Sequence, residues 1–308
     1  MEVASGTLIL IHHHHHHHPQ MLVLFALLTL LLRSPHALGA SNFHLRNHTG
    51  LLFLYAFDEA QTLSSSPTYV RDRTGRGLMG NLTTSQTTVS WSSERQGMRI
   101  PSHSGGVRAE SQLSSADLLS SLTTDFTIEF FFSSPFNSAS QYKLIAGFGD
   151  WPAGAPFVPC NASDEVSEGG WRLFSGISSN IIFDGIFSVN GVPTCRSLAV
   201  SISTNVIQHM VIRARSGLFS LVSHTASQSE PNPELQFAPA LWSRHAAPLT
   251  IANPHPTTGW TGTIYMIAMY NRILPLDEVA ANVLLGPPNS VPATFTPSLS
   301  IPEDSTTT

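Results

Sequence analysis

Acidic side chains gather in one short run of the sequence, Asp164-Glu165-Val166-Ser167-Glu168. Retaining glycoside hydrolases need two carboxyl groups about 5 to 5.5 Å apart, and alternating acids on one strand would supply them. This run lies beside Cys160 and the Gly169-Gly170 pair, which is typical of a solvated loop. The sequence also lacks the Gly-x-Ser-x-Gly turn that presents a nucleophilic serine. We therefore expect a protein that is not an enzyme, with a glycan-processing enzyme or an accessory domain of one as the alternative.

The sequence contains two cysteines, too few for a four-cysteine zinc site. Cys160 and Cys195 lie in polar surroundings rich in Pro and Gly, VPCNAS and VPTCRS. In an oxidising compartment such cysteines can pair, so the sequence predicts a Cys160–Cys195 disulfide. Two separate buried thiols are the alternative.

Three Asn-x-Ser/Thr sequons begin at Asn47, Asn81 and Asn161. They are candidate glycosylation sites if the chain is secreted.

A basic cluster is formed by Arg71, Arg73 and Arg76. Their guanidinium groups could hold sulfated glycans through bidentate contacts. A solvated turn, partly offset by Asp72, is the alternative.

The composition is poor in charge. Charged residues make up 11% and hydrophobic residues 42%, and the net charge is −5, whereas globular proteins average about 25% charged residues. A balance without basic excess argues against nucleic acid as a partner. The sequence is typical of a turn-rich extracellular β protein with a sizeable core.

The first forty residues are expected to lie outside the fold. A run of seven histidines, His12–His18, precedes Met21, which we take as the working start. Leu22–Leu32 is an apolar stretch of signal-peptide length and too short to span a bilayer. Small residues follow, so we expect cleavage after Gly39 or Ala40, a secreted protein and no membrane span in the mature chain. An uncleaved signal anchor is the alternative.

From Leu51 onward, short apolar runs alternate with turn residues about every ten positions, which predicts an all-β sandwich. In 126–132 the side chains of Phe126, Ile128, Phe130 and Phe132 share one face. We expect 143–148 to be the neighbouring strand. The segment 262–274 is apolar on both faces, which predicts a central strand.

One short helix is expected near 275–285, because Pro275 and acidic residues occupy its first turn. A second helical turn is expected at 115–122. The last part, 289–308, is rich in Pro, Ser and Thr and is typical of a disordered linker. The fold is therefore assigned to 41–288.

Five motifs in order resemble the laminin-G-like, concanavalin-A-like lectin jelly-roll family over about 45–286. They are the strand LLFLYAFDE from Leu51, the turn RDRTGRG from Arg71, the strand FTIEFFF from Phe126, LTIAN from Leu249, and the closing strand with its following helix from Trp260. In the family the fourth motif reads Leu-x-Ile-Gly-Asn. The resemblance implies a two-sheet antiparallel jelly-roll sandwich that acts as a binding module.

The resemblance also implies a calcium ion, with Asp72 and the carbonyl of Gly75 as the matching ligands. The family's closing strand carries acidic residues where this chain has Tyr265 and Met266. The alternative role of Asp72 is to cap its own turn. The function expected from all of this is a secreted, non-catalytic module that recognises extracellular glycans or proteins. A purely structural cell-surface or matrix domain remains the other alternative.

Overall fold

The computed structural model describes the chain between residues 46 and 287, with gaps. The described residues are 46–59, 68–84, 90–91, 97–100, 109–111, 125–135, 142–148, 171–176, 180–189, 192–215, 218–223, 227–231, 235–236, 248–252 and 260–287. The expected leader, the expected linker and the expected helical turn at 115–122 lie outside them. No helix in the described part is long and apolar enough to cross a bilayer.

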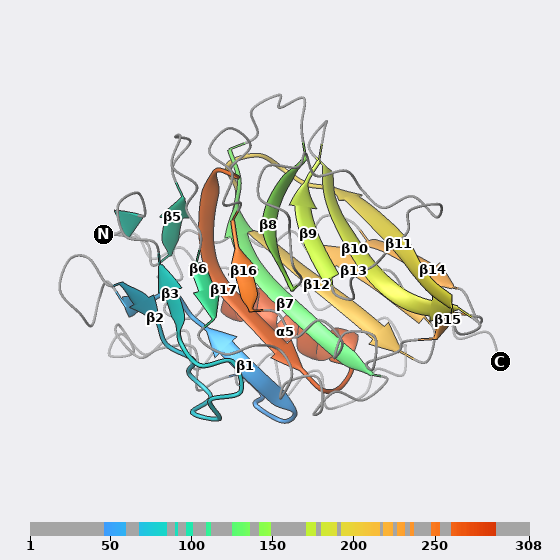
Figure 1. Ribbon diagram of the computed structural model, residues 1–308, viewed down its shortest axis with the longest axis horizontal. Coiled ribbons are helices and arrows are strands. Elements are labelled where there is room, and N and C mark those ends of the chain that lie inside the picture. Colours follow the sequence, from blue (N-terminus) through green and yellow to red (C-terminus); the bar gives the residue numbers. More distant parts are fainter. Residues whose placement is uncertain are drawn as a thin grey trace, which may run out of the picture. The chain divides into compact units, whose positions relative to one another are not determined.

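The described strands form two antiparallel sheets (Figure 1). Sheet A comprises β1 (Leu51–Tyr55), β4 (Ser90–Trp91), β5 (Met98–Ile100), β7 (Phe126–Ser133), β12 (Gln208–Arg215), β13 (Leu218–Ser223), β14 (Ser227–Pro231) and β17 (Gly262–Tyr270). Sheet B comprises β2 (Tyr69–Val70), β3 (Leu82–Thr84), β6 (Ala109–Ser111), β8 (Lys143–Phe148), β9 (Trp171–Ser175), β10 (Asn180–Val189), β11 (Val192–Ser201), β15 (Leu235–Gln236) and β16 (Leu249–Ile251). One helix is described, α5 (Leu276–Leu285). The expected all-β, two-sheet antiparallel sandwich with one short helix is confirmed.

Strand β17 is central to sheet A, as its apolar sequence predicted. It pairs with β7, β5 and β1, and nearly all its residues are buried. The prediction that 143–148 neighbours 126–132 is wrong. Strand β8 lies in sheet B between β9 and β16, while β7 is flanked by β12 and β17. Proximity in sequence therefore misled, because the chain crosses from one sheet to the other between β7 and β8.

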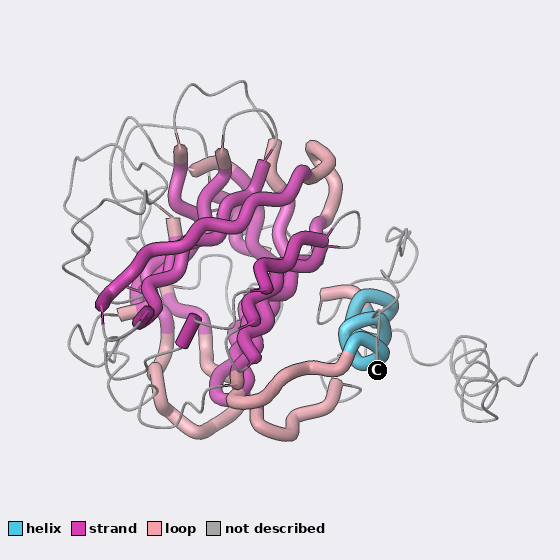
Figure 2. The backbone as a smooth tube through the Cα atoms, turned by 90° about the vertical axis from the view of Figure 1, so that its right-hand side faces the viewer, coloured by secondary structure: helices cyan, strands magenta, loops and turns pink. Residues whose placement is uncertain are grey.

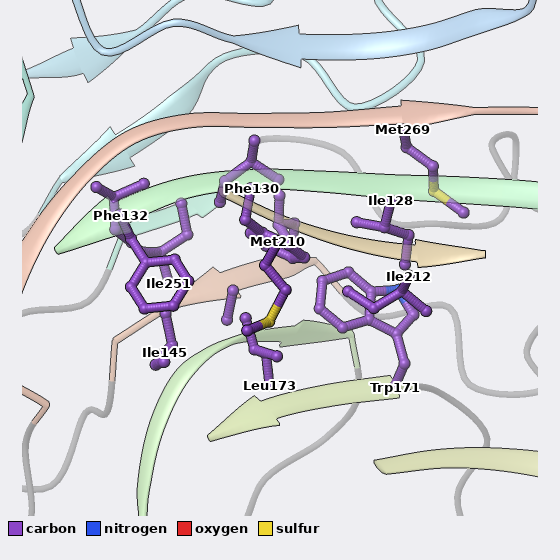
Figure 3. Packing of buried hydrophobic residues seen from close by; sticks show 14 of the residues in the cluster. Ile128, Phe130, Phe132, Ile145, Trp171, Leu173, Met210, Ile212, Ile251 and Met269 are labelled. Atoms are coloured by element: carbon purple, nitrogen blue, oxygen red, sulfur yellow. The ribbon is translucent and has the colours of Figure 1, made fainter. Parts of the chain in front are cut away.

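The main core lies between the two sheets. Side chains from β7, β12 and β17 of sheet A point toward side chains from β8, β9 and β16 of sheet B (Figure 3). Trp171 is at its centre, stacked on Phe183 and in edge contact with Phe130 and Phe148. Aromatic pairs of this kind add about 0.5–1.5 kcal/mol each to the stabilisation from burial, so this cluster anchors the packing of the sheets.

The outer face of sheet A is also covered, here by α5. In Figure 2 the helix lies to one side of the strands. Val279 of the helix packs in a second apolar cluster with outward residues of β1, β7, β12 and β17, including Leu54, Phe131 and Val211. The alternation expected in β7 is thus confirmed, but its other face is buried as well: Thr127 and Glu129 are fully enclosed.

Strand β16 ends at a left-handed residue. Ala252 has φ 61° and its N–H donates to the carbonyl of Ile145 at 2.8 Å. The resembling family carries glycine at this position, which adopts such a conformation without steric cost. Alanine takes it here with its methyl group buried in the main core.

Candidate functional site

Asp72 lies in the turn between β2 and β3, next to β1. Its Oδ1 accepts hydrogen bonds from the main-chain N–H of Leu54 at 3.1 Å, from the N–H of Thr74 at 3.0 Å and from the Thr74 hydroxyl at 2.9 Å. The N–H of Arg73 in turn donates to the carbonyl of Leu54 at 2.8 Å. The carboxylate therefore caps its own turn and fastens that turn to β1, as the alternative reading of Asp72 described.

This donor set does not fit a calcium ion. Calcium takes six to eight oxygen ligands, whereas Oδ1 of Asp72 already accepts three hydrogen bonds and Gly75 contributes only a turn carbonyl. Among the described residues, no group of three or more His, Cys, Asp or Glu side chains could hold a metal ion.

Two more acids of the first motif point toward the same turn. Asp58 forms an ion pair with Arg73, and Oε1 of Glu59 accepts the N–H of Arg71 at 2.7 Å. Burial raises the pKa of Glu59, against the lowering effect of its hydrogen bond from Arg71. Phe57, just before them, has φ 49° with its ring in the core. This conformation is rare for a bulky residue, and the buried ring holds the chain where both acids reach the turn.

The basic cluster is divided by these contacts. Arg73 is half-buried in its ion pair, whereas Arg71 and Arg76 are exposed. The Arg71 guanidinium lies over the ring of Tyr69, 5.5 Å from its centroid, and donates to the Tyr69 hydroxyl at 3.0 Å. Stacking of this kind orders a flexible side chain without neutralising it. The turn thus presents two cationic side chains to solvent, while Asp58 is paired with Arg73 and Asp72 accepts hydrogen bonds from Leu54 and Thr74.

The glycines of this turn have a spacing that resembles a phosphate-binding loop. Gly75, Gly77 and Gly80 follow the pattern Gly-x-Gly-x-x-Gly, and each has a positive φ of 64–68°. The dinucleotide-binding loop opens a helix whose N-terminus holds the pyrophosphate. This turn leads into strand β3 instead, so the glycines shape a tight turn and not a nucleotide site.

A row of positions that are polar except for Gly147 crosses the outer face of sheet B from Tyr69, beside the buried apolar cluster of Leu144, Phe174 and Ile182. Neighbouring strands bring these positions opposite one another in the order Tyr69, Thr83, Glu110, Thr250, Gly147, Arg172, Asp184 and Ser197. Strands about 4.8 Å apart make such a row about 34 Å long. Thr83 and Ser197 are exposed, Tyr69 and Arg172 half-buried, and Thr250 and Asp184 buried. Arg172 is ion-paired with Asp184 at 3.0 Å.

On the other sheet, Glu129 is the centre of a buried polar cluster. Its Oε1 accepts from Arg46 Nη1 at 2.9 Å and lies 2.7 Å from Nε2 of His209. Its Oε2 accepts from the Tyr270 hydroxyl at 3.1 Å and from Asn282 Nδ2 at 3.2 Å. A carboxylate beside a histidine also occurs in hydrolytic active sites. Here both side chains are at most 1% exposed, so no substrate can reach them in this conformation.

Burial and charge act on these groups in opposite directions. Burial alone would raise the pKa of Glu129, but the charge of Arg46 and the hydrogen bond from His209 outweigh it and lower that pKa to about 2. Burial lowers the pKa of His209, against the raising effect of Glu129. Burial also raises the pKa of Tyr270. The cluster is therefore a carboxylate and a guanidinium held together in the interior by neutral partners.

Of the other predicted sites, two sequons are described. Asn47 is exposed and its Oδ1 accepts the N–H of Thr49 at 2.9 Å, while Asn81 is half-buried just before β3. Asn161, Cys160 and the acidic run 164–168 lie outside the described residues. Cys195 is placed in β11 by its backbone alone.

The Glu129 cluster was missed by sequence reasoning, which assigned only the face of Phe126, Ile128, Phe130 and Phe132 to the core. A signal was present, since Glu129 stands within an almost wholly apolar strand that pairs with a doubly apolar one. Nothing in the sequence indicated that Arg46 and Asn282 would meet it from positions 83 and 153 residues away.

No known protein-family profile and no curated protein matches the chain. Among solved structures, it is similar to a Trypanosoma rangeli sialidase in complex with sialic acid, with 12% identity, 75% of this chain and 32% of that chain covered, and a TM-score of 0.46. The binding domain of botulinum neurotoxin DC in complex with SialylT has 11% identity, 77% and 50% coverage, and a TM-score of 0.48. Domain 4 of AbnA, a GH43 extracellular arabinanase from Geobacillus stearothermophilus in complex with arabinotriose, has 12% identity, 75% and 97% coverage, and a TM-score of 0.48. The chain thus spans about a third of the sialidase and half of the toxin domain. At such identities, what those proteins bind is a property of theirs alone.

Proposed function

We propose that this chain is a secreted, non-catalytic recognition domain of the laminin-G-like kind, and that it binds an anionic extracellular glycan at the turn between β2 and β3. The observation that carries the proposal is the exposed pair Arg71 and Arg76, with Arg71 held over Tyr69 at 5.5 Å. Guanidinium groups bind sulfate and carboxylate in bidentate geometry. An ordered, exposed arginine beside an aromatic ring supplies both charge and a flat apolar surface for a sugar.

The arrangement of the two sheets supports this location. On sheet A, α5 and its apolar cluster cover the outer face of β1, β7, β12 and β17. The polar row on sheet B starts at Tyr69, next to Arg71, and its next member, Thr83, is exposed. A saccharide bound at the turn would therefore find hydrogen-bonding groups beside the two arginines, whereas Thr250 and Asp184 farther along the row are buried.

The proposal is tested by binding of the secreted full chain to immobilised heparin and to its desulfated form. We expect binding to the sulfated glycan that weakens with salt, as interactions between exposed charges do, and a loss of at least about tenfold in affinity in Arg71→Ala/Arg76→Ala. Arg99→Ala is the matched control, because Arg99 is exposed on β5 of the other sheet.

Other outcomes would favour the alternatives. If Arg71→Ala/Arg76→Ala bound the sulfated glycan as tightly as Arg99→Ala, the turn would be excluded as the binding site. Turnover of a polysaccharide would support an enzyme, and binding of neither glycan would support a structural domain or a protein ligand. Secretion is checked on the same material: we expect a mature N-terminus at Ala40 or Ser41 and a mass shift on enzymatic removal of N-glycans from Asn47.

A further inference from the structure

The Glu129 cluster joins parts of the chain that are far apart in sequence. Arg46 precedes β1, while Asn282 and Gly286 belong to the end of α5 and the residue after it. Arg46 donates to Glu129 through Nη1, and through Nη2 to the carbonyls of Asn282, at 3.4 Å, and Gly286. Asn282 donates to the same carboxylate. One buried carboxylate on β7 therefore fixes both the segment entering the sandwich and the helix leaving it.

The cluster also closes over apolar surface. Phe131 lies two residues after Glu129, on the same face of β7. The guanidinium of Arg46 is 5.2 Å from the centroid of the Phe131 ring, and the centroid of the His209 ring is 4.4 Å from it. Leu54, Val211 and Val279 belong to the same second cluster. The main core between the sheets contains no residue of α5 and does not include Arg46. An outer layer formed by α5 and the segment at Arg46 can thus separate from sheet A without opening the main core.

We propose that this cluster is an acid-released latch: uptake of a proton by His209 favours a form in which the segment at Arg46 and helix α5 leave the outer face of sheet A while the sandwich stays folded. His209 lies on β12, faces Glu129 from β7 and Arg46 from the entering segment, and is buried with them. Tyr270 of β17 completes the enclosure, with Glu278 of α5 beyond it in an ion pair with Arg272. Protonated His209 would have to share the carboxylate of Glu129 with Arg46, because both side chains contact its Oε1.

The sign of the effect follows from the lowered pKa of His209. In the closed form this histidine resists protonation, mainly through burial, whereas in the released form it titrates near its ordinary pKa of about 6.5. The closed form therefore keeps its full stability above that pH and loses it as the pH falls below it. For each unit between the two pKa values, the opening equilibrium shifts by up to about tenfold.

Amide hydrogen exchange of the full chain tests the latch at pH 7.4 and 5.5, with rates corrected for the intrinsic effect of pH. We expect exchange in peptides covering 46–50 and 276–286 to rise about tenfold at pH 5.5, while peptides from β1, β7 and β12 stay protected. In His209→Gln the side-chain amide can still donate to Glu129 but does not titrate, so the rise should disappear. His48→Gln is the matched control: His48 is exposed, two residues from Arg46, and should leave the response unchanged.

Three results would overturn the latch. One is the same corrected exchange of the two end segments at both pH values in the unaltered chain, a comparison that depends on no variant. Another is an equal rise in His209→Gln. The third is a rise of similar size in β7 and β12, which would mean that acid loosens the whole domain and that no separate outer layer is released.

Discussion

Replacing Glu129 by glutamine tests whether the buried cluster stabilises the fold. The substitution keeps the shape of the side chain and removes its charge. Arg46, whose side chain is 1% exposed, then loses its counter-charge in the interior. Removing one partner of a buried ion pair costs about 3–5 kcal/mol, because the remaining charge stays buried without compensation.

The pKa of Glu129 gives an independent value of similar size. It is about 2 in the folded protein, against an ordinary value of 4.5, and each pKa unit corresponds to about 1.4 kcal/mol. The ionised carboxylate therefore contributes on the order of 3 kcal/mol to the free energy of unfolding. Because the pKa is lowered on folding, this contribution is present above pH 4.5 and is lost as the pH falls toward 2.

The measurement is urea-induced unfolding of the full chain at pH 7, followed by tryptophan fluorescence. Glu129→Gln should lower the free energy of unfolding by about 3–5 kcal/mol. The matched control is Glu278→Gln, which breaks the ion pair with Arg272. Those side chains are 16% and 23% exposed, so about 1 kcal/mol or less should be lost. The account of the cluster would be refuted if Glu129→Gln lost no more free energy of unfolding than Glu278→Gln. It would also be refuted if the loss in Glu129→Gln were as large at pH 3 as at pH 7.

Three further predictions concern other parts of the molecule. Asp72→Asn should lower the free energy of unfolding by about 1 kcal/mol through weaker hydrogen bonds in its turn. Melting curves of the unaltered chain should coincide in EDTA and in millimolar calcium. A calcium-dependent rise in melting temperature that Asp72→Asn abolishes would show instead that the ion binds there. Ala252→Gly should change the free energy of unfolding by less than about 1 kcal/mol, because relief of the left-handed strain, about 1–2 kcal/mol, is offset by the lost methyl burial and the added freedom of the unfolded chain. Ala252→Val should lower it by about 2 kcal/mol or more. Equal stability of the two variants would show that the backbone at residue 252 is not strained. Peptide mapping without reduction should recover Cys160 and Cys195 in one linked pair, whose loss would cost about 3–4 kcal/mol by the chain-entropy model; recovery of two free thiols would exclude the bond.

The periodic features of the fold were predictable from the sequence. Alternation fixes which side chains of β7 face the main core, and an apolar stretch without alternation marked β17 as central. Pro275 and the acids after it located α5. These predictions succeeded because each depends on the spacing of residues within one element.

Features that depend on contacts between distant elements could not be obtained in this way. The assignment of β8 to sheet B requires the path of the chain between sheets, which no local pattern records. The roles of Glu129 and Arg46 require α5 to cover the outer face of sheet A. The turn at Asp72 shows the same limit on a smaller scale: its residues were found, but only its hydrogen bonds to Leu54 and Thr74 distinguish a cap from a metal ligand.

The two sheets differ in where they carry charge. Sheet A carries apolar residues on both faces and contains the buried charge of Glu129, and such a charge is tolerated only where every lone pair is engaged. Helix α5 covers its outer face at β1, β7, β12 and β17. Sheet B carries both the polar row and the buried apolar cluster of Leu144, Phe174 and Ile182 on its outer face, and its turn between β2 and β3 has two exposed arginines. The proposed glycan site at the turn and the proposed response to pH at His209 lie on different sheets, so substitutions at Arg71 and at His209 should alter binding and acid release independently of one another.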